Sequence, residues 1–74
     1  MNKDSLSLKG IVSVGGSIVV SAKDYDVLTL KSIASSGKDK GGYLIINDAD
    51  CLDTLGCKGI ASGNPGHVIF NFCE

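Results

Sequence analysis

Three cysteines and one histidine are residue types that bind zinc in proteins. They stand at Cys51, Cys57, His67 and Cys73, with five, nine and five residues between neighbours. Structural zinc sites instead use close pairs, with about two to four residues between the ligands. Cys57 stands where two similar stretches of the chain have Leu8 and Leu30, and this predicts a core position for it. We therefore expect no metal site and no cofactor.

An acidic group follows the second apolar run of the chain. It consists of Asn47, Asp48, Asp50 and Asp53. Open α/β folds bind ligands beyond the carboxyl ends of their strands, so this group is a candidate divalent-cation or small-ligand site. The stretch lacks the glycine and the distal glutamate of a calcium loop. Aspartates ahead of a helix are commonly caps, and capping is the interpretation we favour.

Other catalytic arrangements find little support. His67 is the sole histidine, and Ser62 and Asp53 define no nucleophile geometry with it. No G-x-G-x-x-G or Walker pattern occurs, and the glycine pairs precede strands, whereas a phosphate-binding loop follows one. The sequence therefore does not predict an enzyme or a nucleotide-binding protein.

Composition limits the function classes further. The chain has 74 residues, 43% hydrophobic and 20% charged, which fits one globular domain. Seven basic and eight acidic residues give a net charge of −1 and no basic stripe, so we expect no nucleic-acid partner. The apolar runs are far shorter than a membrane span, and the N-terminus lacks the apolar core of a signal peptide. The absence of a recognisable signal peptide, together with the odd number of cysteines, predicts a cytoplasmic protein with free thiols.

One short phrase occurs three times, and this repetition organises the whole chain. The copies are "LKGIVSVG" from Leu8, "LKSIASSG" from Leu30 and "CKGIASGN" from Cys57. Each copy leads through a glycine-containing turn into a short apolar run, which begins at Ser17, Tyr43 or His67. A period of about two dozen residues is typical of stacked supersecondary units. We therefore expect three tandem helix–turn–strand repeats.

The helices are predicted from apolar spacing and from capping residues. Apolar side chains at intervals of three and four predict a helix from Tyr25 to Ser36, capped by Asp24 and ended by a left-handed Gly37. A third-unit helix should follow Asp50, with Gly56 and Gly59 on its inward side close to the sheet.

The first unit, residues 5–15, is ambiguous. The repeat predicts a helix there. Its β-branched residues on both sides of Gly15 and Gly16 predict a β-hairpin, which we favour slightly.

From Ser17 onward the chain reads β-α-β-α-β, the pattern of a parallel sheet with right-handed crossovers. Both helices then lie on one side of the sheet. Alternation along the strands places uniformly apolar residues on one face, namely Ile18, Val20, Ala22, Leu44, Ile46, Val68, Phe70 and Phe72. The other face receives three rows: Ser17, Tyr43 and His67; Val19, Ile45 and Ile69; Ser21, Asn47 and Asn71.

The half-polar face is the candidate functional surface. Val19, Ile45 and Ile69 would form a short apolar ridge beside Tyr43 and His67, a patch suited to docking a protein. We therefore predict a non-catalytic protein–protein interaction module that works as a homo-oligomer or as a subunit of an assembly.

Several alternatives remain open. An N-terminal segment could cover the ridge, the ridge could simply contact water, or an exposed strand edge could mediate association. The protein could also be an immunity-type regulator that blocks a partner enzyme. The helix–turn–strand units are similar to those of α/β repeat proteins in general, a likeness too broad to place functional residues.

Overall fold

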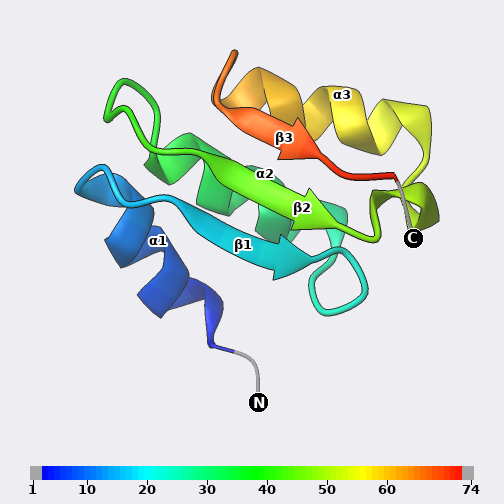
Figure 1. Ribbon diagram of the computed structural model, residues 1–74, viewed down its shortest axis with the longest axis horizontal. Helices are drawn as coiled ribbons and strands as arrows, with labels where there is room; N and C mark the ends of the chain where they lie inside the picture. Colours follow the sequence, from blue (N-terminus) through cyan, green and yellow to red (C-terminus); the bar gives the residue numbers. More distant parts are fainter. Residues whose placement is uncertain (1–2, 73–74) are drawn as a thin grey trace.

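The structure, a computed structural model, describes residues 3–72 as three helices and a three-stranded parallel sheet (Figure 1). The elements follow one another as α1 (Ser5–Ser13), β1 (Ile18–Ser21), α2 (Val27–Ser36), β2 (Leu44–Asn47), a short 3-10 turn η1 (Ala49–Cys51), α3 (Thr54–Gly63) and β3 (Val68–Phe70). The strands lie in the order β1-β2-β3, and both pairs are parallel. The predicted α/β class and the β-α-β-α-β order are confirmed.

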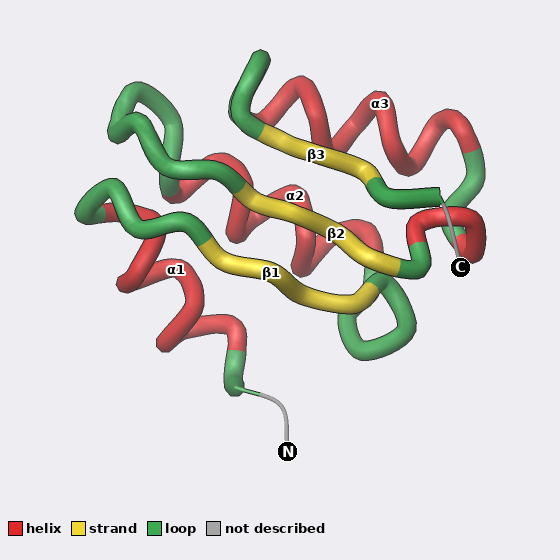
Figure 2. Tube along the Cα trace, in the orientation of Figure 1, coloured by secondary structure: helices red, strands yellow, loops and turns green. Residues whose placement is uncertain are grey.

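The strands and helices form two layers. Figure 2 shows the three strands side by side in sequence order, with the helices behind them in that view. Helix α2 contacts both α1 and α3. The register pairs Val19 with Ile45 and Ile45 with Ile69, as the alternation of the sequence predicts.

The hydrophobic core lies between the helices and the inner side of the sheet. Its largest fully buried side chains come from α2, β2 and α3 and are Leu30, Ile33, Leu44, Ile46 and Ile60. Burying a side chain of this size contributes about 1.5 to 3 kcal/mol relative to leaving it exposed. Together these contacts hold the strands in a fixed position relative to the helices.

The favoured hairpin prediction for residues 5–15 is wrong, because this segment is helix α1. The Asp4 carboxylate accepts a hydrogen bond from the Ser7 amide at 2.8 Å and caps the helix. Leu8 and Val12, four residues apart, are both buried, so helical spacing outweighs the β-branched content. Gly15, with φ of 92°, turns the chain towards β1.

Both predicted caps and the predicted C-terminal glycine conformation are also wrong. Helix α2 begins two residues later than expected, because Asp26 rather than Asp24 accepts from the Thr29 amide, at 2.8 Å. The turn η1 delays α3, whose cap is Asp53 rather than Asp50. Gly37 has φ of −96° and is therefore not left-handed.

The two glycines of α3 have different surroundings. A Cβ built on Gly56 would lie 3.1 Å from Val27 Cγ2, so this glycine allows α3 to approach α2. A Cβ on Gly59 would meet no atom within 4 Å. The prediction that both glycines lie close to the sheet is therefore wrong: one faces a helix and the other faces open space.

The three copies of the repeated phrase occupy the same place in the three helices. Each copy begins at the fourth residue after the capping aspartate, at Leu8 after Asp4, at Leu30 after Asp26 and at Cys57 after Asp53. Each of these helices leads directly through a turn into a strand. The phrase therefore marks the same stretch of each helix, ahead of the turn into the strand.

Candidate functional site

The three strands bring Val19, Ile45 and Ile69 into one row across the sheet, which we call the ridge. Their neighbours along the strands, such as Ile46, belong to the core. Val19 is 60% exposed, Ile69 is 46% exposed and Ile45 is half-buried between them. The sheet therefore presents a row of large aliphatic side chains to solvent, on what we call its outer face.

An aromatic row borders the ridge where the chain enters the strands. The rings of Tyr43 and His67 lie with their centroids 4.9 Å apart and their planes inclined by 32°. Tyr43 is 41% exposed, and its amide donates to the Ser17 hydroxyl at 3.0 Å. The ring of His67 approaches the Pro65 carbonyl through Nδ1 at 3.3 Å. The pair offers two tilted ring faces together with polar atoms.

A polar row borders the ridge on its other side. The Asn71 side-chain amide donates to Asn47 Oδ1 at 3.1 Å, across β2 and β3. The Ser21 hydroxyl donates to Asp48 Oδ2 at 2.7 Å. These bonds fix the orientation of the side chains, so a partner would meet hydrogen-bonding groups that are already in position.

The aspartates of the acidic group have different structural roles. Asp48 adopts a left-handed conformation with φ of 58°, accepts from Ser21 and lies 4.0 Å from Lys23 Nζ. Asp53 caps α3 through the Gly56 amide at 2.7 Å, while Asp50 is exposed in η1. Within residues 3–72, no three or more His, Cys, Asp or Glu side chains are grouped so as to hold a metal ion. Of these three aspartates, Asp53 is the one whose side chain caps a helix.

The cysteines lie in different environments. Cys51 is exposed and Cys57 is half-buried, and neither takes part in a disulfide. Burial, and to a smaller extent the nearby Asp53 carboxylate, raises the pKa of the Cys57 thiol. Cys57 is thus less enclosed than the core position predicted for it. Cys73 lies outside the described residues.

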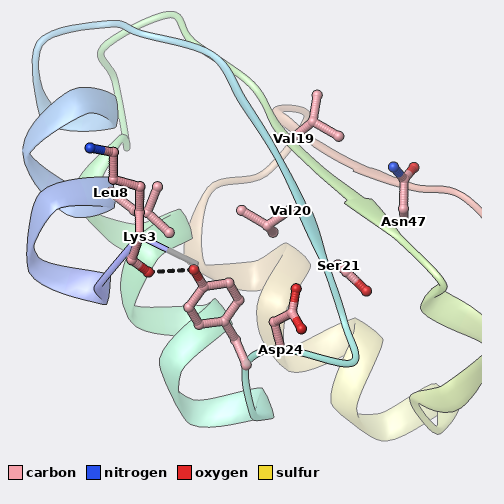
Figure 3. Close-up of a pocket in the computed structure, with 8 residues that line it drawn as sticks. Lys3, Leu8, Val19, Val20, Ser21, Asp24 and Asn47 are labelled. Carbon is pink, nitrogen blue, oxygen red and sulfur yellow. Dashed lines mark hydrogen bonds between the residues drawn. The ribbon is translucent and has the colours of Figure 1, made fainter. Parts of the chain in front are cut away.

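A hollow of about 350 Å³, which sequence reasoning did not identify, lies along the free edge of β1 (Figure 3). Leu8, Val20 and Tyr25 provide its apolar walls, and Lys3 and Asp24 provide charged groups. The Tyr25 hydroxyl donates to the Lys3 carbonyl at 2.5 Å and ties the N-terminal segment to the β1–α2 loop. The hollow forms where the sheet ends, so no local motif could have revealed it.

From residue 3 onward, the segment before β1 does not cover the ridge. Helix α1 packs against α2, and its buried residues Leu8 and Val12 belong to the same core as Ile33. The exposure of Val19 and Ile69 describes the outer face with α1 already in place. The ridge therefore meets solvent in the part of the chain that the structure describes.

Comparisons with protein-family models, with curated proteins and with solved structures gave no match. Among residues 3–72, none of the helices combines the length and the apolar character required to cross a membrane.

Proposed function

We propose that the protein is a non-catalytic protein–protein interaction module that works as a subunit of an assembly, with the outer face of its sheet as the contact surface. The observation that carries the proposal is the exposure of the ridge, with Val19 at 60% and Ile69 at 46%. Exposed aliphatic residues that are contiguous and bordered by polar groups are typical of docking sites.

The chemistry of the outer face defines the surface that would fit it. Strands lie about 4.8 Å apart, so the ridge is roughly 10 Å long and accommodates one or two apolar side chains of a partner. The amide groups of Asn47 and Asn71 border the ridge and provide hydrogen-bonding groups. The ring pair of Tyr43 and His67 offers the aromatic contact that is enriched in interface centres.

The same surface serves several kinds of partner. A second copy, a different protein of an assembly, or an enzyme that the protein blocks as an immunity-type regulator would each need only this face. We place the protein in the cytoplasm, where the free thiols of Cys51 and Cys57 would persist. The net charge of −1 favours a protein partner over nucleic acid.

No observation favours the second candidate function, a cation or small-ligand site at Asn47, Asp48, Asp50 and Asp53. Asp53 caps a helix, Asp48 accepts from Ser21, and Asn47 is bonded to Asn71. A calcium or magnesium titration followed by amide NMR tests it, and we expect no specific shifts in this segment.

Affinity capture with matched surface variants tests the proposal. Ile45→Asp and Ile69→Asp place a charge on the ridge, and Leu28→Asp places one on α2, where the leucine is 78% exposed. A protein that the parent and the Leu28→Asp variant retain, and that both ridge variants lose, supports the proposal. Circular dichroism checks that each variant is folded. Equal retention by all four proteins, or no retention above bare resin, contradicts it.

A further inference from the structure

The three helices share a longer pattern than the repeated phrase. Counted from the capping aspartate, each reads Asp-x-Leu-x-x-Lys-x-Ile-x-Ser, in residues 4–13, 26–35 and 53–62. Equivalent positions can therefore be compared from one unit to the next. When equivalent positions carry the same side chain but differ in burial, the presence or absence of a neighbouring unit causes the difference.

The first unit is open on the side where a preceding unit would lie. Ile33 and Ile60 are completely buried (0% exposed), whereas the equivalent Ile11 is 41% exposed. On α3 this side faces α2, because a Cβ built on Gly63 would lie 2.7 Å from Ser35 Oγ. The equivalent of Gly63 in α1 is Val14, which is 84% exposed. Helix α1 thus presents apolar side chains where α2 and α3 meet a neighbouring helix.

The last unit is open on the opposite side. Leu30 is 0% exposed and Ala34 is 1% exposed, and their equivalents in α3, Cys57 and Ala61, are both half-buried. Phe72 extends from the end of β3, is 54% exposed and stacks on Phe70 with ring centroids 6.2 Å apart. The α3–β3 end therefore presents small helix residues and two aromatic rings.

The two free strand edges match each other in hydrogen-bonding phase. The amides of Ile18 and Ala22 donate to β2, so the backbone groups of Val19 point to the free edge of β1. On β3, the His67 carbonyl accepts from Leu44 and the Asn71 amide donates to Ile46. The backbone groups of residues 68 and 70 consequently point to the free edge of β3. Pairing these two edges would repeat the β2–β3 ladder.

The hollow beside β1 is the place that the aromatic end of another copy would fill. Phe70 is in register with Ile46, and Ile46 with Val20, so all three hold the same position of their strands. A β3 strand added to the edge of β1 in this register would set Phe70 next to Val20, which lines the hollow with Leu8 and Tyr25 (Figure 3). A recess with apolar walls and two charged groups at one end thus meets the half-buried ring of Phe70 and the exposed ring of Phe72 from the other.

We infer that copies of this chain associate head to tail, with the α3–β3 end of one copy stacked on the α1–β1 end of the next and β3 paired parallel with β1. A second copy is the occupant because its end carries the same pattern that already forms the α1–α2 and α2–α3 contacts. Such contacts are heterologous and generate open chains or rings. Each added copy extends the sheet and lengthens the ridge. The inference uses the ends of the array and is independent of the function proposed for the outer face.

Copies blocked at one end test the inference by sedimentation equilibrium. Ile11→Glu blocks the α1 end, and Ala61→Glu blocks the α3 end. Val14→Asp and Phe72→Asp repeat the two blocks at positions that are 84% and 54% exposed, in case either first variant does not fold. The average mass of the parent should rise with concentration beyond that of a dimer. Each blocked variant alone should remain a monomer, and an equimolar mixture of the two types should form a 1:1 dimer and nothing larger.

The ridge variant Ile45→Asp is the control that separates this inference from the proposed function. It should associate like the parent, because the ridge takes no part in end-to-end stacking. A parent that is monomeric at every concentration overturns the inference. So do single-end variants that still dimerise, or blocked variants whose mixture stays monomeric while the parent associates. Association lost only in Ile45→Asp would instead assign self-contact to the outer face.

Discussion

Ile11 and Ile33 hold the same position in consecutive helices, yet Ile11 is 41% exposed and Ile33 is completely buried. The difference arises from the place of each unit in the array, since α2 has a helix on both sides and α1 has one only on the side of α2. Identical residues in a repeated pattern should therefore contribute unequally to stability.

Truncation of these two isoleucines tests that expectation. Ile33→Ala should lower the free energy of unfolding by about 2 to 5 kcal/mol, because it removes a fully buried side chain and leaves a cavity. Ile11→Ala should lower it by about 1 kcal/mol or less, since much of the side chain already contacts water. Urea denaturation at a protein concentration low enough to keep the parent monomeric measures both. Equal losses would show that the units do not differ in packing as the structure indicates.

The cap of α3 provides a second matched pair. Asp53→Ala removes the acceptor of the Gly56 amide and should cost about 1 kcal/mol. Asp50→Ala changes an exposed carboxylate in η1 and should alter stability by no more than about 0.5 kcal/mol. Thermal and urea unfolding of the two variants provide the comparison. A larger loss of stability for Asp50→Ala than for Asp53→Ala would indicate that Asp50, the residue suggested by the sequence, caps α3.

Two glycine substitutions should change stability in opposite directions. A Cβ on Gly42 would overlap the Gly16 carbonyl oxygen and lie 2.7 Å from that of Gly15, so Gly42→Ala should cost about 1 to 3 kcal/mol. A Cβ on Gly59 meets no atom within 4 Å, and Gly59→Ala should stabilise helix α3 by about 0.5 to 1 kcal/mol. Urea midpoints measure both changes. A destabilising Gly59→Ala would mean that this part of α3 is more crowded than described.

Stability should decline in acid as two capping carboxylates become protonated. Hydrogen bonds from Ser7 and from Thr29 hold the pKa values of Asp4 and Asp26 below the usual value. A lowered folded-state pKa means that the folded protein binds fewer protons, so its contribution is complete above the unfolded-state pKa and is lost as the pH falls through the folded one.

Replacement of one capping carboxylate isolates this effect. Asn caps helices about as well as Asp and does not titrate, so Asp26→Asn should reduce the loss of stability between neutral pH and pH values below the folded-state pKa. Unfolding curves recorded across that range give the comparison. An unchanged dependence on pH would exclude Asp26 as a contributor.

Much of the strand arrangement was predictable from sequence, because it depends on local signals. Short β-branched runs after glycine turns identified β2 and β3, and alternation identified Val19, Ile45 and Ile69 as one row. If each strand follows its helix through a similar turn, equivalent residues of neighbouring strands pair in parallel. These features need no knowledge of distant contacts.

The remaining features depend on competition between similar residues or on the ends of the array. Asp24 competes with Asp26 for the cap of α2; in the structure Asp26 accepts from the Thr29 amide, while the Asp24 amide donates to the Ser21 carbonyl in the turn after β1. Helical and hairpin patterns coexist before Gly15, and the burial of Leu8 and Val12 against α2 decides for a helix. The Asp-x-Leu-x-x-Lys-x-Ile spacing, had it been extended back to Asp4, Asp26 and Asp53, would have given all three caps. The hollow beside β1 has no local signal.

Methyl NMR tests most directly whether the outer face is a contact surface. The protein, labelled at Ile, Leu and Val methyl groups, is titrated with a partner recovered by affinity capture. We expect shifts or broadening at Val19, Ile45 and Ile69, with the signals of the exposed helix residues Leu28 and Leu55 unchanged. Changes at Leu28 and Leu55, with the ridge unaffected, would contradict it.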